Sequence, residues 1–405
     1  MRAYERLLNY VKVYTTSDES TGTVPSTKRQ FDLAKLLVEE MKALGIENPH
    51  VDDKCYVYGW IPATKGYEEK PALGFIAHLD TAPDASGENV KPQVIENYDG
   101  EDVELGKSGL SIKTELYPEM KKLKGRTLIV TDGTTLLGAD DKSGIAEILT
   151  AAEEIIKKDL PHGKICIAFT PDEEIGGGAA DLDLEKFGAK YAYTVDGGPE
   201  NEITYECFNA VSAKFKIKGA AVHTGSAKGK MKNAVRMAVE IENMLPSGDI
   251  PELTEGREGF YHLCNINGTM ESAEMSYIVR DHDSSKMEMR KEILKHIEKV
   301  MNEKYGEGSV ELIIKEQYRN MIEKIAPCMH LVENVREVMH ELGMETDEAP
   351  VRGGTDGAQL SFRGLPCPNL GTGGYAFHGP YEHITAEGMD IAVKVILGVI
   401  GKYAK

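Results

Sequence analysis

Apolar residues recur at the spacing of an amphipathic helix in several stretches of the chain. Residues 27–44 carry one apolar face and end before Gly45, a residue that often terminates helices. The first helix that this pattern predicts begins near the start, with one face formed by Tyr4, Leu7, Leu8 and Val11. The same spacing predicts further helices over 142–158, 231–244, 284–304 and 327–342.

Short runs of apolar residues predict the strands of a buried sheet. Residues 72–77, 164–169 and 191–195 are almost wholly apolar, as in strands that are covered on both faces. The helix predicted over 142–158 lies between two of these runs. Strand and helix therefore alternate, which is typical of an α/β domain with right-handed connections.

The pattern changes after about residue 204. Residues 212–218 alternate polar and apolar positions, which suits a half-exposed strand, and strands over 275–280 and 310–314 follow around the charged helix. We therefore expect a smaller α+β domain, residues 208–317, inserted into a larger α/β domain formed by 1–207 and 318–405. The stretch between Thr81 and Thr127 is rich in Gly, Pro, Asn and Asp, so it is either functional or built from small irregular hairpins.

Composition narrows the classes of function. The chain has 405 residues, with 47 Lys and Arg against 66 Asp and Glu, a formal net charge of −19. Such a surface repels nucleic acid and anionic membranes, so we expect neither as a partner. The six cysteines are scattered without framework spacing, the charged start lacks a signal peptide, and no run is long enough to span a membrane. These features predict a soluble, cytoplasmic protein.

Several acidic and imidazole side chains occupy positions where a metal site would need them, and three of these positions follow predicted strands. Because the carboxyl ends of parallel strands meet at one edge of a sheet, these side chains should converge. They are His78, Asp80, Asp140, Glu173, Glu174, Asp196 and His378.

Each of these motifs also has a plainer interpretation when it is taken alone. The His78-Leu79-Asp80 spacing is a weak metal signal, although metal-bound imidazoles commonly depend on a nearby carboxylate. An Asp at 140 or 141 is a typical helix N-cap, and one Asp can cap while the other binds metal. The adjacent Glu173 and Glu174 form either an exposed acidic turn or a ligand next to a free base.

The set as a whole favours a centre of two metal ions. His78, His378, Asp140, Asp196 and one of the two glutamates supply five ligands, which is three for each ion if one carboxylate bridges. Oxygen and nitrogen ligands without thiolate suit hydrolytic zinc, and cobalt or manganese is possible. Two ions about 3.5–4 Å apart can share and activate one water.

At these motifs the chain resembles the dizinc aminoacylase/carboxypeptidase metallopeptidase family, and within it the tripeptide aminopeptidases. General marks of the family are residues 78–80, 138–141, 172–174, 196–198 and 353–356. The marks of the tripeptide aminopeptidases are residues 23–27 (TVPST), 81–93, 259–263 and 274–283. The resemblance extends over nearly the whole chain. It implies a zinc-peptidase-like domain with a central mixed sheet flanked by helices, and a lid or dimerisation domain at the insertion.

The resemblance also implies a role for each residue of the metal centre. One zinc ion would be held by His78 and Asp196, the other by Glu174 and His378, and Asp140 would bridge them. Glu173 would be the general base, and Asp80 would orient His78. The peptide bond between Asp140 and Asp141 would be cis.

Three further residues take their roles from the resemblance alone. His223 matches a histidine that reaches the site of the partner subunit in a homodimer and stabilises the oxyanion. Arg280 would hold the carboxylate of a short peptide substrate, and Arg352 is a second candidate for that role. In this chain Thr224-Gly225-Ser226 follows His223, where Pro-Gly-Thr is usual in the family.

We therefore expect a zinc-dependent aminopeptidase that releases the N-terminal residue of tripeptides. A dipeptidase, carboxypeptidase or aminoacylase of the same chemistry is the first alternative. A peptide-binding protein without turnover is the second, although the joint presence of all five ligands, the base and Asp80 argues against it.

Overall fold

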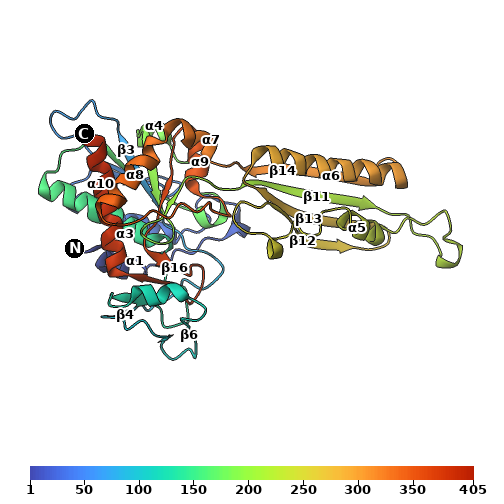
Figure 1. Cartoon of the computed structure of the whole chain (residues 1–405), viewed down its shortest axis with the longest axis horizontal. Helices are drawn as coiled ribbons and strands as arrows, with labels where there is room; N and C mark the ends of the chain where they lie inside the picture. The colour runs from blue at the N-terminus through green and yellow to red at the C-terminus, as the bar shows by residue number, and fades with distance from the viewer. The chain divides into compact units, whose positions relative to one another are not determined.

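The three apolar runs lie side by side in one sheet in the computed structural model, which describes all 405 residues (Figure 1). They are β3 (Leu73–His78), β8 (Ile165–Thr170) and β9 (Tyr191–Val195), and β3 runs parallel to both neighbours. Four more strands complete the order β1-β2-β8-β3-β9-β15-β10. These are β1 (Glu47–Val51), β2 (Val57–Ile61) and β10 (Ile203–Thr204), which pair antiparallel, and β15 (Asn369–Leu370), which is parallel to β9. The sheet is mixed, as predicted.

Helices cover both faces of this sheet, which explains why its central strands are apolar throughout. On one face Ile76 packs with Phe187 of α4 (Leu184–Phe187) and Leu360 of α9 (Asp356–Phe362). On the other, Phe75 stacks on Tyr193, whose hydroxyl donates to a carbonyl of α8 (His330–Glu341). Helix α8 contacts α10 (Ala386–Ala404), which contacts α3 (Ala139–Lys158) and α1 (Ala3–Tyr10).

Helix α1 buries part of the predicted apolar face, since Leu7 and Val11 are fully buried. Arg6 and Tyr10 are buried, whereas Tyr4 and Leu8 are only half-buried. The reason is a polar network, in which the Arg6 guanidinium donates to Glu40 at 2.7 Å and to Glu153 at 2.7 Å. Glu40 belongs to α2 (Gln30–Leu44), the helix predicted over 27–44, and Glu153 to α3. Arg6 thus joins three helices from a buried position next to Leu7.

Removing the Arg6 guanidinium should destabilise the larger unit of the protein. Arg6→Leu leaves the partly buried carboxylates of Glu40 and Glu153 without their shared cation, so we expect a loss of about 3–5 kcal/mol in the free energy of unfolding. Urea unfolding followed by the fluorescence of Trp60, the single tryptophan, measures this loss. The control is Arg2→Leu, since Arg2, at the start of α1, forms a solvent-exposed ion pair with Asp390 of α10. Equal stability of the two variants would contradict the prediction.

A second, smaller sheet joins one strand of the Gly- and Pro-rich stretch 81–127 to strands from 128–130 and 374–385. Its strands β4 (Gln93–Ile95), β7 (Leu128–Val130), β17 (His383–Thr385) and β16 (Gly374–Tyr375) pair antiparallel in the order β16-β17-β7-β4. The hairpin of β5 (Val103–Glu104) and β6 (Ser111–Ile112) lies nearby in sequence, and Val103, Ile112, Leu128 and Val130 share one apolar core. The region 81–127 therefore contains one small hairpin, which shares its apolar core with β7. The pairing of β7 with β17 brings residues 131–140 close to residues 376–382.

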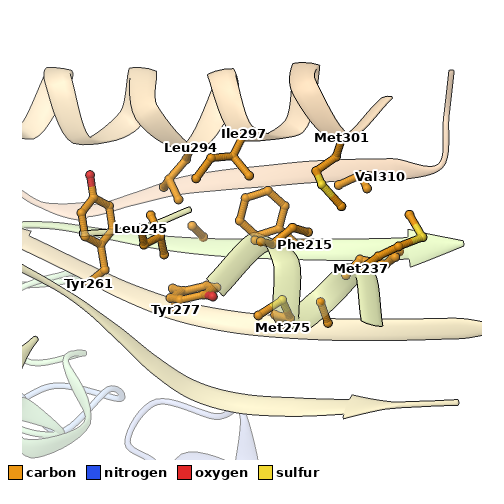
Figure 2. Close-up of a cluster of buried hydrophobic side chains, with 14 of the residues drawn as sticks. Phe215, Met237, Leu245, Tyr261, Met275, Tyr277, Leu294, Ile297, Met301 and Val310 are labelled. Carbon is orange, nitrogen blue, oxygen red and sulfur yellow. The ribbon is translucent and has the colours of Figure 1, made fainter. Parts of the chain in front are cut away.

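The inserted segment forms a four-stranded antiparallel sheet covered by helices on one face. The order is β12 (Phe260–Gly268), β13 (Ser272–Asp281), β11 (Asn209–Lys218), β14 (Val310–Tyr318). Alternate residues of β11 are buried, as the sequence predicted for a half-exposed strand. Figure 2 shows Phe215 and Tyr277 of the sheet facing Leu294 and Ile297 of α6 (Ser284–Tyr305). Helix α5 (Ala234–Glu242) adds Met237 to this core.

The chain divides into two compact units. The first comprises Met1–Tyr205, Glu323–Ala349 and Thr355–Lys405, and the second comprises Glu206–Ile322 and Pro350–Gly354. Residues 206–207, 318–322 and 350–354 thus lie with the inserted segment, whereas the sequence assigned them to the larger domain. The cause is local, because Val351 pairs with Cys207 and accepts a hydrogen bond from His282. No helix combines the length and the apolar character that crossing a membrane requires.

Candidate metal centre

The candidate ligands sit where the parallel strands of the large sheet end. His78 is the last residue of β3, Asp196 directly follows β9, and Glu173 and Glu174 follow β8 after a short turn. His378 lies in the loop between β16 and β17, with a left-handed backbone (φ 62°). The carboxyl ends of parallel strands meet at one edge of a sheet, and this geometry gathers residues that are distant in sequence.

Asp140 lies between the two imidazoles. One carboxylate oxygen, Oδ1, is 3.0 Å from Nε2 of His78, and the other, Oδ2, is 3.3 Å from Nε2 of His378. Each imidazole also faces a second carboxylate: His78 Nε2 is 3.9 Å from Asp196, and His378 Nε2 is 3.0 Å from Glu174. The five side chains therefore form two adjoining groups that share Asp140.

The start of helix α3 holds Asp140 in this position. The peptide bond between Asp140 and Asp141 is cis, as the family resemblance predicted. Asp141 points the other way: its carboxylate accepts the backbone N–H of His78 at 3.0 Å and that of Gly144 at 3.2 Å. A Cβ on Gly144 would lie 1.8 Å from the carbonyl oxygen of Val195, so only glycine lets α3 approach the end of β9 this closely. One Asp caps the helix while its neighbour faces the imidazoles.

Asp80 supports both sides of the site from a fully buried position. Its carboxylate lies 3.4 Å from Nδ1 of His78, and its carbonyl oxygen lies 3.0 Å from the same nitrogen. The carboxylate also accepts the backbone N–H groups of Glu173, at 2.9 Å, and Glu174, at 3.2 Å. Asp80 thus lies against His78 and anchors the turn that carries both glutamates.

Asp172 is a supporting residue to which sequence reasoning assigned no role. It has a left-handed backbone (φ 59°) directly before Glu173, a conformation that is uncommon outside glycine. Its buried carboxylate accepts from the backbone N–H of Ser26 at 2.7 Å, the Ser26 hydroxyl at 2.5 Å and the Gln30 amide at 2.6 Å. Ser26 belongs to the motif at residues 23–27. This motif therefore anchors the turn that carries Glu173.

Burial and crowding raise the pKa of Glu173, Asp196 and Glu174, whereas hydrogen bonds to His378 and His78 outweigh burial and lower the pKa of Asp140. Burial raises the pKa of Glu173 well above its usual value, and the charges of Asp196 and Asp356 add to this effect. Burial is also the main cause that raises the pKa of Asp196, and the charge of Asp140 is the second. Burial likewise raises the pKa of Glu174. So many carboxylates in one buried place need positive charge to remain ionised.

The two imidazoles supply part of that charge. Hydrogen bonds to Asp140 and Glu174 raise the pKa of His378 to about 11. Burial by itself would lower the pKa of His78, but hydrogen bonds to Asp140 and Asp80 outweigh it and raise that pKa well above its usual value. Dications among these groups would take over this charge compensation, since metal-bound imidazole is neutral.

The donor set fits metal ions. Two groups have ligand atoms that all lie within 4.8 Å of one another, His78–Asp140–Glu174 and His78–Asp141–Asp196. The oxygen Oε1 of Glu174 is buried and has no hydrogen-bond partner, which is unusual for a carboxylate unless a cation binds it. Imidazole and carboxylate ligands without thiolate suit hydrolytic zinc, cobalt or manganese.

The remaining predicted residues belong to the second unit. His223 is exposed, and its ring nitrogen Nδ1 accepts the backbone N–H of Gly225 at 3.2 Å. The guanidinium of Arg280 donates to the carbonyls of Val211 and Val279, at 3.3 and 3.0 Å.

Arg352 holds a loop of its own unit. Its guanidinium donates to the carbonyls of Gly256 and Glu258 and to the hydroxyl of Thr254, all at 2.9 Å, and it lies over the ring of Phe208. A substrate carboxylate at Arg352 would have to compete with these acceptors.

Comparison with known proteins assigns the chain to a family. Peptidase T from Caldanaerobacter subterraneus subsp. tengcongensis is 52% identical over 406 residues, covering 100% of this chain and 99% of that protein. Peptidase T from Geobacillus kaustophilus is 51% identical over 398 residues, covering 98% and 97%. The chain belongs to the peptidase T family. This confirms the predicted resemblance, and it makes the protein a hydrolase of peptide bonds.

Structures and a domain match agree with the peptidase T assignment. The fold matches the aminopeptidase PepT of Bacillus cereus with a TM-score of 0.80 and 23% identity, over 100% of this chain and 98% of that one. It also matches a dinuclear metal binding peptidase of the M20 family from Bacillus subtilis, with a TM-score of 0.66 and 16% identity, over 98% and 97%. Residues 205–309 match the peptidase dimerisation domain. The predicted fold class is confirmed.

Proposed function

We propose that this member of the peptidase T family is a metal-dependent aminopeptidase that removes the N-terminal residue of tripeptides. In the proposal His78 and Asp196 would hold one zinc ion, Glu174 and His378 would hold the other, and Asp140 would be shared by both. The observation that carries it is the position of Asp140, with one carboxylate oxygen 3.0 Å from one imidazole and the other 3.3 Å from the second. Cobalt or manganese would fit the same donors.

The ions would polarise the scissile carbonyl and lower the pKa of a bound water, which is the chemistry that such centres supply. Glu173 is the general base of the proposal. Its carboxylate forms no hydrogen bond within the protein, so it is free to accept a proton from the attacking water and to pass it to the leaving amino group. Burial and the charges of Asp196 and Asp356 raise its pKa, which suits a group that must both take and return a proton.

His223 is the oxyanion donor in this proposal. Since Nδ1 accepts the N–H of Gly225, the neutral ring carries its proton on Nε2, the nitrogen left to donate. This contact supports the ring where the usual Pro is replaced by Thr224. The proposal assigns the C-terminal carboxylate of the peptide to Arg280, with Arg352 as the weaker candidate. A bound C-terminal carboxylate would explain a preference for short peptides.

We also propose that the protein is a homodimer through its second unit. The match of residues 205–309 to the peptidase dimerisation domain supports this assembly. In the dimer, His223 of one subunit would serve the site of the other, in line with the role that the family resemblance implies.

A comparison of three small substrates tests the proposed specificity. Zinc-loaded protein is incubated with Ala-Ala-Ala, Ala-Ala and N-acetyl-Ala, with and without chelator. We expect release of Ala and Ala-Ala from the tripeptide, abolished by the chelator, and little reaction of the other two. Faster cleavage of the dipeptide or the N-acetyl compound would point to a dipeptidase or an aminoacylase. No turnover of any of the three would favour a peptide-binding protein.

A further inference from the structure

Glu382 is a buried carboxylate that receives three backbone N–H groups from one loop. Its side chain is 1% exposed. Its Oε2 atom accepts from Leu137 N at 2.7 Å and from Gly138 N at 2.8 Å, and its Oε1 atom accepts from Asp140 N at 3.0 Å. The loop that it holds is the one that carries Asp140 into helix α3.

Glu382 also belongs to the segment that carries His378. Its backbone N–H donates to Gly379 O at 3.2 Å, which closes a turn after His378. The next residue begins β17, where Ile384 pairs with Ile129 of β7, so the sheet fixes the base of this segment. The backbone of Glu382 thus bonds to the turn that follows His378, and its side chain bonds to the loop that carries Asp140.

The arrangement is a built site for a negative charge. The N–H groups of 137, 138 and 140 converge on one carboxylate, as backbone groups do when they cradle an anion. The side-chain nitrogen of the buried Lys142, which donates to Val13 O at 2.8 Å, lies near Gly138 on the same loop. Only 3.3 Å separates the Asp140 and His378 side chains that these two segments carry.

We propose that Glu382 is a positioning residue of the metal centre. It holds the Asp140 backbone against the segment of His378, so that the protein sets the spacing between these two ligands. The inference rests on the proposed function, because it takes Asp140 and His378 to be metal ligands. Carboxylates that support metal ligands in this way commonly change metal affinity or activity by about 10–100-fold when they are replaced.

Glu382→Gln is the variant that tests the proposal. Glutamine has nearly the same size but only one acceptor oxygen, so its amide N–H₂ would face at least one of the three N–H donors. Glu387→Gln is the matched control. Glu387 lies on the same segment, and its carboxylate accepts the backbone N–H of Thr127 at 2.7 Å and the Thr127 hydroxyl at 3.1 Å, but it holds no candidate ligand.

The readouts separate positioning from general stability. Zinc affinity, measured against a chromophoric chelator, should fall by about 10–100-fold in Glu382→Gln and stay unchanged in Glu387→Gln. The visible spectrum of the cobalt-substituted protein should change only in Glu382→Gln. In that variant kcat for Ala-Ala-Ala should fall while KM stays near the wild-type value.

Each outcome bears on one of the two proposals. Wild-type zinc affinity and an unchanged cobalt spectrum in Glu382→Gln would overturn the role of Glu382 and leave the proposed function standing. Wild-type protein that binds no zinc would overturn the proposed function, and this inference with it. If Glu382→Gln does not fold, Glu382→Asp replaces it, with both oxygens kept on a side chain one methylene shorter. Wild-type zinc affinity in Glu382→Asp would overturn the proposal.

Discussion

Replacing Glu173 with Gln should lower kcat by about 10⁴-fold, at the upper end of what a general base contributes. Glutamine keeps the size of the side chain but cannot take a proton from water or return one to the leaving amine. Glu174 and the other proposed ligands are untouched, so the metal content should remain that of the wild type. The measurement is steady-state turnover of Ala-Ala-Ala together with metal analysis of the same sample.

The control for this experiment is Glu185→Gln, an exposed glutamate on α4 in the same part of the chain. It makes the same change of charge without touching the site, and its turnover should equal that of the wild type. Near-normal turnover in Glu173→Gln would remove Glu173 from the role of base. Loss of metal in that variant would instead make Glu173 a ligand.

Asp140→Asn should reduce both metal content and activity. The Asp140 carboxylate presents one oxygen to each imidazole, whereas asparagine has a single acceptor oxygen and can serve only one side. We expect at least one of the two ions to be lost. Turnover should fall by about 10³-fold or more, since a catalytic metal ion contributes several kcal/mol to a reaction of this kind.

Asp159→Asn is the matched control at the other end of helix α3. Asp159 is exposed and has a left-handed backbone (φ 49°), which asparagine also adopts readily. Metal analysis after gel filtration, alongside turnover of Ala-Ala-Ala, compares the two variants. An Asp140→Asn protein that keeps both ions and full activity would exclude a bridging role.

The sheet and the edge on which the site lies could be predicted from the sequence because their signals are local. Apolar runs ending at His78 and before Asp196 predict buried parallel strands, and the residues at the carboxyl ends of such strands meet at one edge of the sheet. The local pattern allows one of the paired acids 140–141 to cap the helix and the other to bind metal, but it does not indicate which. In the structure Asp141 accepts backbone N–H groups, and Asp140 faces the imidazoles.

The supporting residues could not be predicted in the same way. Glu382 binds backbone N–H groups, which every residue except proline has, so no partner in the sequence marks it. The partners of Asp172 are Ser26 and Gln30, which lie more than a hundred residues earlier in the sequence. No helix or strand periodicity links positions so far apart. Arg6 is likewise buried beside carboxylates on two other helices, and the apolar pattern of α1 gives no sign of these partners.

The scattering of the candidate ligands along the chain has a consequence for biosynthesis. His78 is made early, whereas His378 and the residue that ties its turn to Asp140 are made near the end of the sequence. A chain still being synthesised therefore lacks one side of the proposed centre until residues 378–382 have emerged from the ribosome. Under the proposed ligand assignment, such a chain would not cleave peptides while it is incomplete.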